Sequence, residues 1–458
     1  MNRSEIEALV KKQNAFFSSN QTKDVKFRLS CLKRLYKEIK QAERSVINAL
    51  KQDLGKSEYE SYMTEIGMVY QEIKHMKRNL KKYAKKKKVK MPISQFPSKG
   101  YRIPSPYGTV LIVSPWNYPF NLTMVPLVDA IAAGNTVIVK PSNYSSNTTS
   151  VIELILSRVF SSEHVKVVTG GKEAVNDLLA QKFDYIFYTG GKAVGQKIME
   201  EASRTLTPVT LELGGKSPCI VCDDANIDVA AARIVFGKCI NAGQTCVAPD
   251  YLIVDSKIKD KLVEALKKEI VKQYGINPIE NYNYGKIIND YHFDRLVDLL
   301  HDGHIIFGGE NNQKNKISPT LIDKVSLESS LMQEEIFGPI LPIFTYKRLE
   351  EIVAIVKKNP TPLSLYLFTN DKAIEKMIMD NINFGGGCIN DTISHVAALN
   401  LPFGGIGTSG IGAYHGKAGF DTFSHYKSIL KKKNWLDINL RYQPYNDKKL
   451  KKVKRFLK

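Results

Sequence analysis

Short runs of β-branched and aromatic residues alternate with helical stretches between residues 108 and 213. The runs cover residues 109–113, 136–140, 165–168, 185–188 and 208–213. Because parallel strands need long crossovers between them, this alternation predicts a parallel sheet with helices on both faces. Ligands of such sheets bind at the carboxyl ends of the strands, often against the N-terminus of a helix.

The rest of the chain is predicted to add helices and a second α/β segment. Residues 24–54 carry apolar side chains at spacings of three and four, and Gly55 stands where that helix would stop. After residue 213 we expect a helix over 226–240, a strand over 251–254 and an amphipathic helix over 257–273. Beyond residue 399 the chain becomes rich in glycine and then basic.

The charge of the chain is strongly positive, with 66 Lys and Arg against 46 Asp and Glu, a net +20. The excess is mostly lysine, gathered at 81–88 and 448–458. Nucleic-acid sites usually mix arginine and aromatics with such charge, so we favour a solvated surface and expect no nucleic acid partner. No apolar run approaches a membrane span, and the N-terminus lacks the apolar core of a signal peptide. We therefore expect a cytoplasmic protein.

Two motifs in the sequence are set aside. Cys219 and Cys222 fit C-x-x-C but lie in a short apolar run, so we interpret them as reduced strand cysteines. Residues 405–410 fit G-x-G-x-x-G, yet no strand–helix unit surrounds them and no acidic residue follows at the ribose-binding distance. We interpret that segment as a tight glycine turn. The eight histidines make no metal-ligand pattern, and we expect no metal.

Three side chains are candidates for covalent chemistry. Cys246 lies in a glycine-containing loop, where a thiol can be exposed and activated as a nucleophile, although most cysteines are small core residues. Glu212 ends a predicted strand 34 residues earlier and is a candidate general base, or else a cap or a partner of Lys216. Asn117 could donate to a developing oxyanion together with the backbone N–H of Cys246, or simply occupy a turn.

The motifs around these residues resemble, in order, those of the aldehyde dehydrogenase superfamily. They are Pro-Trp-Asn-Tyr-Pro-Phe, Leu-Glu-Leu-Gly-Gly-Lys, Asn-Ala-Gly-Gln-Thr-Cys and Glu-Glu-Ile-Phe-Gly-Pro. The ending Pro-Phe-Gly-Gly-Ile-Gly-Thr-Ser-Gly is similar to that of the class 3 group, which includes fatty-aldehyde dehydrogenases. The resemblance covers residues 5–446.

The resemblance implies oxidation of an aliphatic or aromatic aldehyde to the carboxylic acid. Cys246 would attack the aldehyde to give a thiohemiacetal, and Asn117 would stabilise its oxyanion. Hydride transfer to NAD or NADP would leave a thioester, which water activated by Glu212 would hydrolyse. We place Tyr118 and His415 on the substrate side.

The resemblance also implies a set of cofactor-binding residues. Lys140 would bind the adenine ribose, Glu335 the nicotinamide ribose, and the turn at 189–195 the pyrophosphate. The full set is Trp116, Lys140, Ser142, Asn143, Thr189, Gly190, Gly191, Val194, Leu213, Gly214, Glu335 and Phe337. Asn143 and Gly191 depart from the family, which often has Glu and Ser there. A carboxylate at 143 would repel a 2′-phosphate, so Asn143 predicts that NADP is accepted as well as NAD.

The fold that the resemblance implies is α/β, with a Rossmann-type parallel-sheet cofactor domain, an α/β catalytic domain and a small oligomerisation arm. We expect the cofactor domain over 1–212, interrupted by an arm near 88–106, and the catalytic domain over 213–398. Residues 399–458 would return to the cofactor domain and end in a basic tail. The arms suggest a homodimer, and the tail a weak contact with an anionic membrane.

Two other functions remain open from the sequence. A coenzyme A-acylating dehydrogenase would pass the thioester to a thiol, but such enzymes usually lack the base at Glu212. A non-catalytic protein that binds a dinucleotide, nucleic acid or membrane would not need Cys246, Glu212 and Asn117 together.

Overall fold

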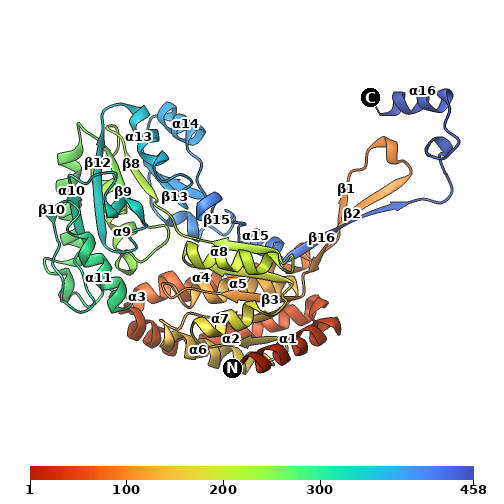
Figure 1. Cartoon of the computed structure of the whole chain (residues 1–458), viewed down its shortest axis with the longest axis horizontal. Coiled ribbons are helices and arrows are strands. Elements are labelled where there is room, and N and C mark those ends of the chain that lie inside the picture. The colour runs from red at the N-terminus through yellow and green to blue at the C-terminus, as the bar shows by residue number, and fades with distance from the viewer. Residues whose placement is uncertain (458) are drawn as a thin grey trace.

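The computed structural model describes residues 1–457 as two open sheets and an arm that projects from them (Figure 1). The first sheet has the order β15-β7-β6-β3-β4-β5. Its parallel strands are β3 (Thr109–Val113), β4 (Thr136–Lys140), β5 (Val165–Val167), β6 (Tyr185–Thr189) and β7 (Val209–Glu212). The short β15 (Gly410–Ile411) adds antiparallel to β7. The predicted parallel sheet is confirmed, and each strand lies within two residues of its expected bounds.

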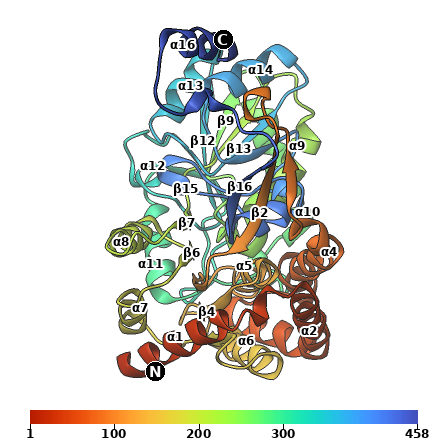
Figure 2. The ribbon, with the colours of Figure 1, turned by 90° about the vertical axis from the view of Figure 1, so that its right-hand side faces the viewer.

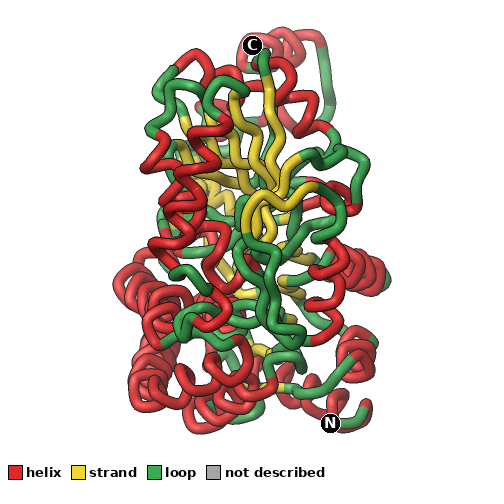
Figure 3. The backbone as a smooth tube through the Cα atoms, turned by 90° about the vertical axis from the view of Figure 1, so that its left-hand side faces the viewer, coloured by secondary structure: helices red, strands yellow, loops and turns green. Residues whose placement is uncertain are grey.

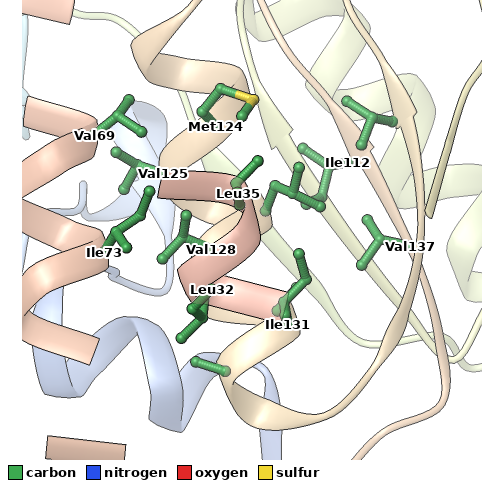
Figure 4. Close-up of a cluster of buried hydrophobic side chains, with 14 of the residues drawn as sticks. Leu32, Leu35, Val69, Ile73, Ile112, Met124, Val125, Val128, Ile131 and Val137 are labelled. Carbon is green, nitrogen blue, oxygen red and sulfur yellow. The ribbon is translucent and has the colours of Figure 1, made fainter. Parts of the chain in front are cut away.

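Helices cover both faces of this sheet because its strands are apolar on both sides. Val110 and Ile112 face one cluster, with α2 (Val25–Leu54), α4 (Gly67–Tyr83), α5 (Asn121–Ala133) and α6 (Ser146–Val159). Leu111 and Val113 face the other, with α1 (Arg3–Ser18), α7 (Lys172–Leu179) and α8 (Lys192–Ser203). This alternation follows from the two-residue period of a strand. Figure 4 shows Ile112 and Val137 packed with Leu35 and Val128 in the first cluster.

The helix predicted over 24–54 is confirmed, and its ends follow from local chemistry. The Asp24 carboxylate accepts from the backbone N–H groups of Lys26 and Phe27 at 3.1 and 3.3 Å, which caps the first turn. Gly55 closes the helix at φ 68°, a left-handed conformation that glycine adopts without strain.

The second sheet has the order β10-β11-β12-β9-β8-β13-β14, all parallel except β10. The strands are β8 (Pro218–Val221), β9 (Tyr251–Asp255), β10 (His304–Phe307), β11 (Thr320–Asp323), β12 (Ile340–Tyr346), β13 (Ser364–Phe368) and β14 (Gly386–Ile389). Its helices are α9 (Ile227–Cys239), α10 (Lys259–Tyr274), α11 (Asp290–Leu299), α12 (Ser330–Gln333), α13 (Leu349–Lys357) and α14 (Lys372–Asn381). Figure 3 shows the strands of this sheet between helices.

The two sheets are joined by five residues. β7 ends at Glu212 and β8 begins at Pro218, so the segment 213–217 carries the chain from the first sheet to the second. The chain returns after β14, and β15 and α15 (Gly416–Thr422) pack on the first sheet and its helices.

The arm is a three-stranded antiparallel sheet that leaves the body (Figures 1 and 2). It consists of β1 (Lys87–Val89), β2 (Ser98–Pro106) and β16 (Ser424–Lys432). The strands β2 and β16 pair over nine residues, and α16 (Asp447–Phe456) stands at the far end of the arm. Within residues 1–457, no helix combines the length and apolar character that crossing a bilayer requires.

The C-x-x-C and G-x-G-x-x-G motifs, to which the sequence analysis gave no functional role, have structural roles. Cys219 lies in β8 and Cys222 follows it, and both are free, buried thiols. Residues 407–409 form a single 3-10 turn that leads into β15. No group of three His, Cys, Asp or Glu side chains in the described part of the chain could hold a metal ion.

Candidate active site

The loop that carries Cys246 is held in an unusual backbone conformation. Asn241, Ala242 and Gly243 have φ angles of 53°, 51° and 76°, all left-handed. Such a run costs free energy in a non-glycine residue, so the surroundings must hold it. The backbone N–H of Asn241 donates to Oε1 of Glu60 at 2.9 Å, and its side-chain amide donates to the carbonyl of Asn117 at 2.8 Å. The first bond ties the loop that carries Cys246 to Glu60, and the second ties it to the loop that follows β3.

The thiol of Cys246 is half-buried and faces two carboxyl groups. Burial, and then the negative charges of Glu335 and Glu212, raise its pKa above the ordinary value. Burial and the neighbouring carboxyl groups outweigh the backbone N–H groups of Cys246 and Val247, which lower the pKa of the thiol. Activation of the thiol by its loop stays a prediction.

Glu212 ends β7 and is 2% exposed, and neither of its carboxyl oxygens has a hydrogen-bond partner among the described residues. Burial raises its pKa well above the ordinary value. The alternatives of a helix cap or a pair with Lys216 are excluded, because the Lys216 ammonium binds Asp250 and the carbonyls of Leu331 and Glu334. An unpaired buried carboxyl beside a thiol is well suited to accept a proton.

Asn117 lies in the loop after β3, and its side chain points toward the loop that carries Cys246. Its side-chain amide donates one N–H to the carbonyl of Gln244 at 3.1 Å, two residues before Cys246. The amide has a second N–H, for which the described residues provide no partner. Tyr118 beside it is buried, and its hydroxyl lies 2.6 Å from Oγ1 of Thr245.

A buried ion pair beneath this loop was missed from the sequence. The Lys56 ammonium donates to Oε1 of Glu65 at 2.6 Å and to the carbonyl of Asn117 at 3.1 Å, and both side chains are 0% exposed. The other oxygen of Glu65 accepts from the backbone N–H groups of Phe120 and Asn121 at 3.0 and 2.9 Å. A lysine after a helix stop looks like a surface charge, so no sequence signal identified the pair.

The turn from β6 into α8 presents unused hydrogen-bond donors. Oγ1 of Thr189 is buried without a partner among the described residues, and Gly191 precedes α8 as an N-cap residue that has no side chain to cap the helix. A Cβ on Gly190 would collide with the Tyr188 hydroxyl, whereas a Cβ on Gly191 would meet nothing within 4 Å. Val194 is exposed in the first turn. A bare helix N-terminus of this kind fits the pyrophosphate of a dinucleotide.

The strand β4 ends in Lys140, which is buried and not a surface charge. Its ammonium donates to the carbonyl of Pro141 at 2.8 Å, and burial lowers its pKa to about 8. Ser142 is half-buried and Asn143 is exposed. A buried amine with one partner is free to donate to the hydroxyls of a ribose.

The remaining predicted cofactor residues come from the second sheet and the joining segment. The Glu335 carboxylate lies against Gly214, where a Cβ would collide with it, and close packing also places Leu213 against Gly195. Phe337 packs edge-on against Trp116, with ring centroids 5.4 Å apart.

His292 was missed from the sequence and joins this aromatic group. Its ring lies 5.0 Å from that of Trp116, its Nδ1 is buried without a partner, and burial lowers its pKa to about 4. No motif spacing singles it out in the sequence.

His415 lies apart from these residues, against Glu72 on α4. Its ring is 2% exposed and stacks on that of Tyr414, and its Nδ1 lies 3.5 Å from Oε2 of Glu72.

Lys238, eight residues before Cys246 on α9, carries a buried ammonium with no partner among the described residues. Burial lowers its pKa to about 8. The unfolded chain, with the ordinary value of 10.5, therefore binds the proton more tightly, and the folded protein gains stability as the pH rises from 8 to 10.5. We expect Lys238→Met to raise the free energy of unfolding at pH 7 by up to about 3 kcal/mol.

Denaturant unfolding of both proteins at pH 7 and above pH 10 checks this expectation. The gain should shrink at the higher pH, where the lysine is neutral in the folded protein and loses its proton in the unfolded chain as the pH passes 10.5. A gain of the same size at both pH values would contradict it, because hydrophobic packing alone would then account for the effect.

Comparison with known proteins identifies the family of the chain. Residues 1–429 match the aldehyde dehydrogenase family. The chain is 48% identical over 447 residues to a 4,4'-diaponeurosporen-aldehyde dehydrogenase from Staphylococcus aureus (strain NCTC 8325 / PS 47), covering 97% of each protein. It is 42% identical over 445 residues to a dimeric NADP-preferring aldehyde dehydrogenase from Canis lupus familiaris, covering 96% of this chain and 98% of that one.

A solved structure described as the substrate-bound state of Staphylococcus aureus AldH has a TM-score of 0.97 to this chain. The two are 47% identical, and the match covers 99% of both chains. The sequence motifs, the fold and the geometry of the site therefore indicate the same family. The chain belongs to the aldehyde dehydrogenase family, as a member of its class 3 group, and oxidises aldehydes to carboxylic acids with NAD or NADP.

Proposed function

We propose that Cys246 is the nucleophile and Glu212 the base of a hydrolytic aldehyde dehydrogenase. The observation that carries this assignment is the Glu212 carboxyl, which is buried and has no hydrogen-bond partner among the described residues, and whose charge acts on the Cys246 thiol. Sulfur attacks the carbonyl carbon, and the free N–H of the Asn117 amide donates to the oxyanion that forms. A dinucleotide held by the residues named below would supply the hydride acceptor for this carbon. Water that has lost a proton to Glu212 then attacks the thioester, and the C–S bond breaks to release the acid.

The cofactor would be held by both sheets. Thr189, Gly190 and the N-terminus of α8 would bind the pyrophosphate, Lys140 the adenine ribose, and Glu335 the nicotinamide ribose. The unpaired Thr189 hydroxyl and the open space at Gly191 support this assignment.

Asn143 supports the use of both cofactors, because its exposed amide does not repel a 2′-phosphate. We expect Asn143→Glu to raise the Kd of NADP at least about 10-fold, since the new carboxylate would face the phosphate, and to leave the Kd of NAD unchanged or lower. Titration of each cofactor by fluorescence measures both constants, with Asn147→Glu on the exposed start of α6 as the control. A wild-type preference for NAD above about 100-fold would rule out dual use.

The substrate class is proposed to be an apolar aldehyde, aliphatic or aromatic. The support is the 48% identity to a relative whose name specifies a 4,4'-diaponeurosporen-aldehyde. Values of kcat/KM for saturated aldehydes of increasing chain length test this. We expect kcat/KM to rise with chain length, and a preference for short polar aldehydes would contradict the proposal.

The arm is proposed to join two copies of the chain, and a relative at 42% identity is named dimeric. It exposes apolar side chains on a projecting sheet, including Val89, Ile429 and Leu430 at 44–45% exposure. Light scattering should give twice the chain mass for the wild type and a monomer for Ile429→Lys/Leu430→Lys. A monomeric wild type that sediments with anionic vesicles at low salt would instead favour the membrane contact. The cytoplasmic location stays a prediction.

A further inference from the structure

A buried ion pair joins segments that carry the nucleophile and the base, and the reaction proposed above uses neither of its members. Lys216 comes four residues after Glu212, and Asp250 comes four residues after Cys246. Both side chains are buried, and the Lys216 ammonium binds the Asp250 carboxylate. Removing two charges from water costs free energy that their attraction alone seldom repays. The other contacts of the pair therefore indicate what it does.

These contacts lie on both sides of Glu335. The Lys216 ammonium donates to the backbone carbonyl of Glu334 at 2.9 Å. The second carboxylate oxygen of Asp250 accepts from the backbone N–H of Ile336 at 3.1 Å. Hydrogen bonds to a charged group are about twice as strong as neutral ones. The pair thus holds the two peptide groups that flank Glu335, one before it and one after it.

The segment that these bonds hold is strained and closely packed. Phe337 has φ 54°, in the left-handed region, which costs free energy in a residue with a bulky side chain. The carbonyl of Ile336 accepts from the Arg295 guanidinium at 2.5 Å, and a Cβ on Gly214 would collide with the Glu335 carboxylate. A strained backbone keeps its conformation only while its neighbours impose it. Loss of the ion pair should therefore let the Glu335 carboxylate move.

We propose that Lys216 and Asp250 are positioning residues that hold Glu335 against the nicotinamide ribose for hydride transfer. The proposal rests on the ribose-binding role proposed for Glu335. Transfer between two reactants requires them to be close and aligned, and a displacement of about 1 Å can cost about 100-fold in rate. The pair therefore acts on the rate of hydride transfer by fixing the backbone of the group that holds the ribose.

The nucleophile and the base are held by other contacts. In the loop that carries Cys246, the backbone N–H of Asn241 donates to Glu60. Glu212 ends a strand that pairs with β6 on one side and with β15 on the other. An activated aryl ester acylates a thiol directly, and the base then activates the water that removes the acyl group, so ester hydrolysis needs no dinucleotide. Ester hydrolysis thus measures Cys246 and Glu212 without a contribution from Glu335.

Lys216→Met/Asp250→Asn tests the proposal, because it removes the ion pair without leaving either charge buried alone. We expect the first-turnover rate of reduced-cofactor formation, followed at 340 nm by stopped flow at saturating NAD, to fall at least about 10-fold. The Kd of NAD, measured by fluorescence titration, should rise less than this rate falls, since the contacts to the pyrophosphate and the adenine ribose remain. Hydrolysis of 4-nitrophenyl acetate without cofactor should stay within about twofold of the wild type.

Two further variants serve as controls. Glu335→Gln should slow the first turnover at least as much as the double variant, because it changes the ribose-binding group itself. Lys259→Met/Asp323→Asn removes an ion pair of 2.6 Å between α10 and β11 of the same sheet, and should change neither rate. Asp250→Asn alone is a milder change, which keeps the test available if the double variant does not fold, and should show a smaller loss of first-turnover rate with ester hydrolysis retained.

The outcomes separate the positioning role from the ribose role of Glu335. A wild-type first-turnover rate in the variants of the Lys216–Asp250 pair, with a slow Glu335→Gln, would overturn the positioning role. Equal losses of first-turnover rate and of ester hydrolysis would also overturn it, by indicating a general structural role. A wild-type first-turnover rate in Glu335→Gln would overturn the ribose role, and the proposal with it.

Discussion

Glu212→Gln is expected to retain hydride transfer and to slow steady-state turnover by about 1,000-fold, the middle of the range for a general base. The first turnover survives because the neutral amide removes a negative charge that raises the pKa of the Cys246 thiol. The fold should tolerate the change, since the carboxyl makes no hydrogen bond that would be lost. Stopped-flow absorbance at 340 nm would then record one equivalent of reduced cofactor followed by a very slow phase.

The same variant separates hydrolysis from transfer of the acyl group to coenzyme A. The wild type should turn over fully without coenzyme A, because Glu212 activates water. Turnover of the wild type only when coenzyme A is present would support the acylating alternative. Equal steady-state rates in Glu212→Gln and the wild type would contradict the base role.

Lys56→Met is expected to lower the free energy of unfolding by about 3–5 kcal/mol, because it leaves the Glu65 carboxylate buried without its cation. The same change removes the ammonium that binds the Asn117 carbonyl, so kcat should fall as well. Denaturant unfolding and the rate at 340 nm measure the two effects.

Two further variants test this explanation. Lys56→Met/Glu65→Gln should recover much of the stability, since glutamine keeps an acceptor for Phe120 and Asn121 and carries no charge. Lys11→Met breaks the exposed pair with Glu7 and should cause no measurable change. A loss in Lys11→Met as large as in Lys56→Met would contradict the assignment of the cost to burial.

The first sheet could be predicted from the sequence because its signals are local. Apolar runs, the capping residue Asp24 and the stop residue Gly55 each act within a few residues, and the structure has the predicted strands and helix. The candidate chemistry was also local, since Cys246 and Glu212 lie in motifs that the family preserves in order.

What the sequence could not supply depends on contacts between distant segments. Lys56 and Glu65 support Asn117 across more than 50 positions, and nothing in their neighbourhood distinguishes them from surface charges. The pKa of Cys246 is raised first by burial and then by the charges of Glu335, which comes 89 residues later, and Glu212. The fold sets both the burial and these neighbours, so the local motif could not indicate them.

The central claim is that Cys246 carries the acyl group that Glu212 helps water to remove. Intact-protein mass spectrometry of Glu212→Gln after mixing with an aldehyde and NAD tests it most directly. The thiol loses its proton and the aldehyde loses a hydride, so the expected gain is the aldehyde mass less two hydrogens, located on Cys246 by peptide analysis. Reduced cofactor formed without any adduct on Cys246, or an adduct on another cysteine, would contradict the account.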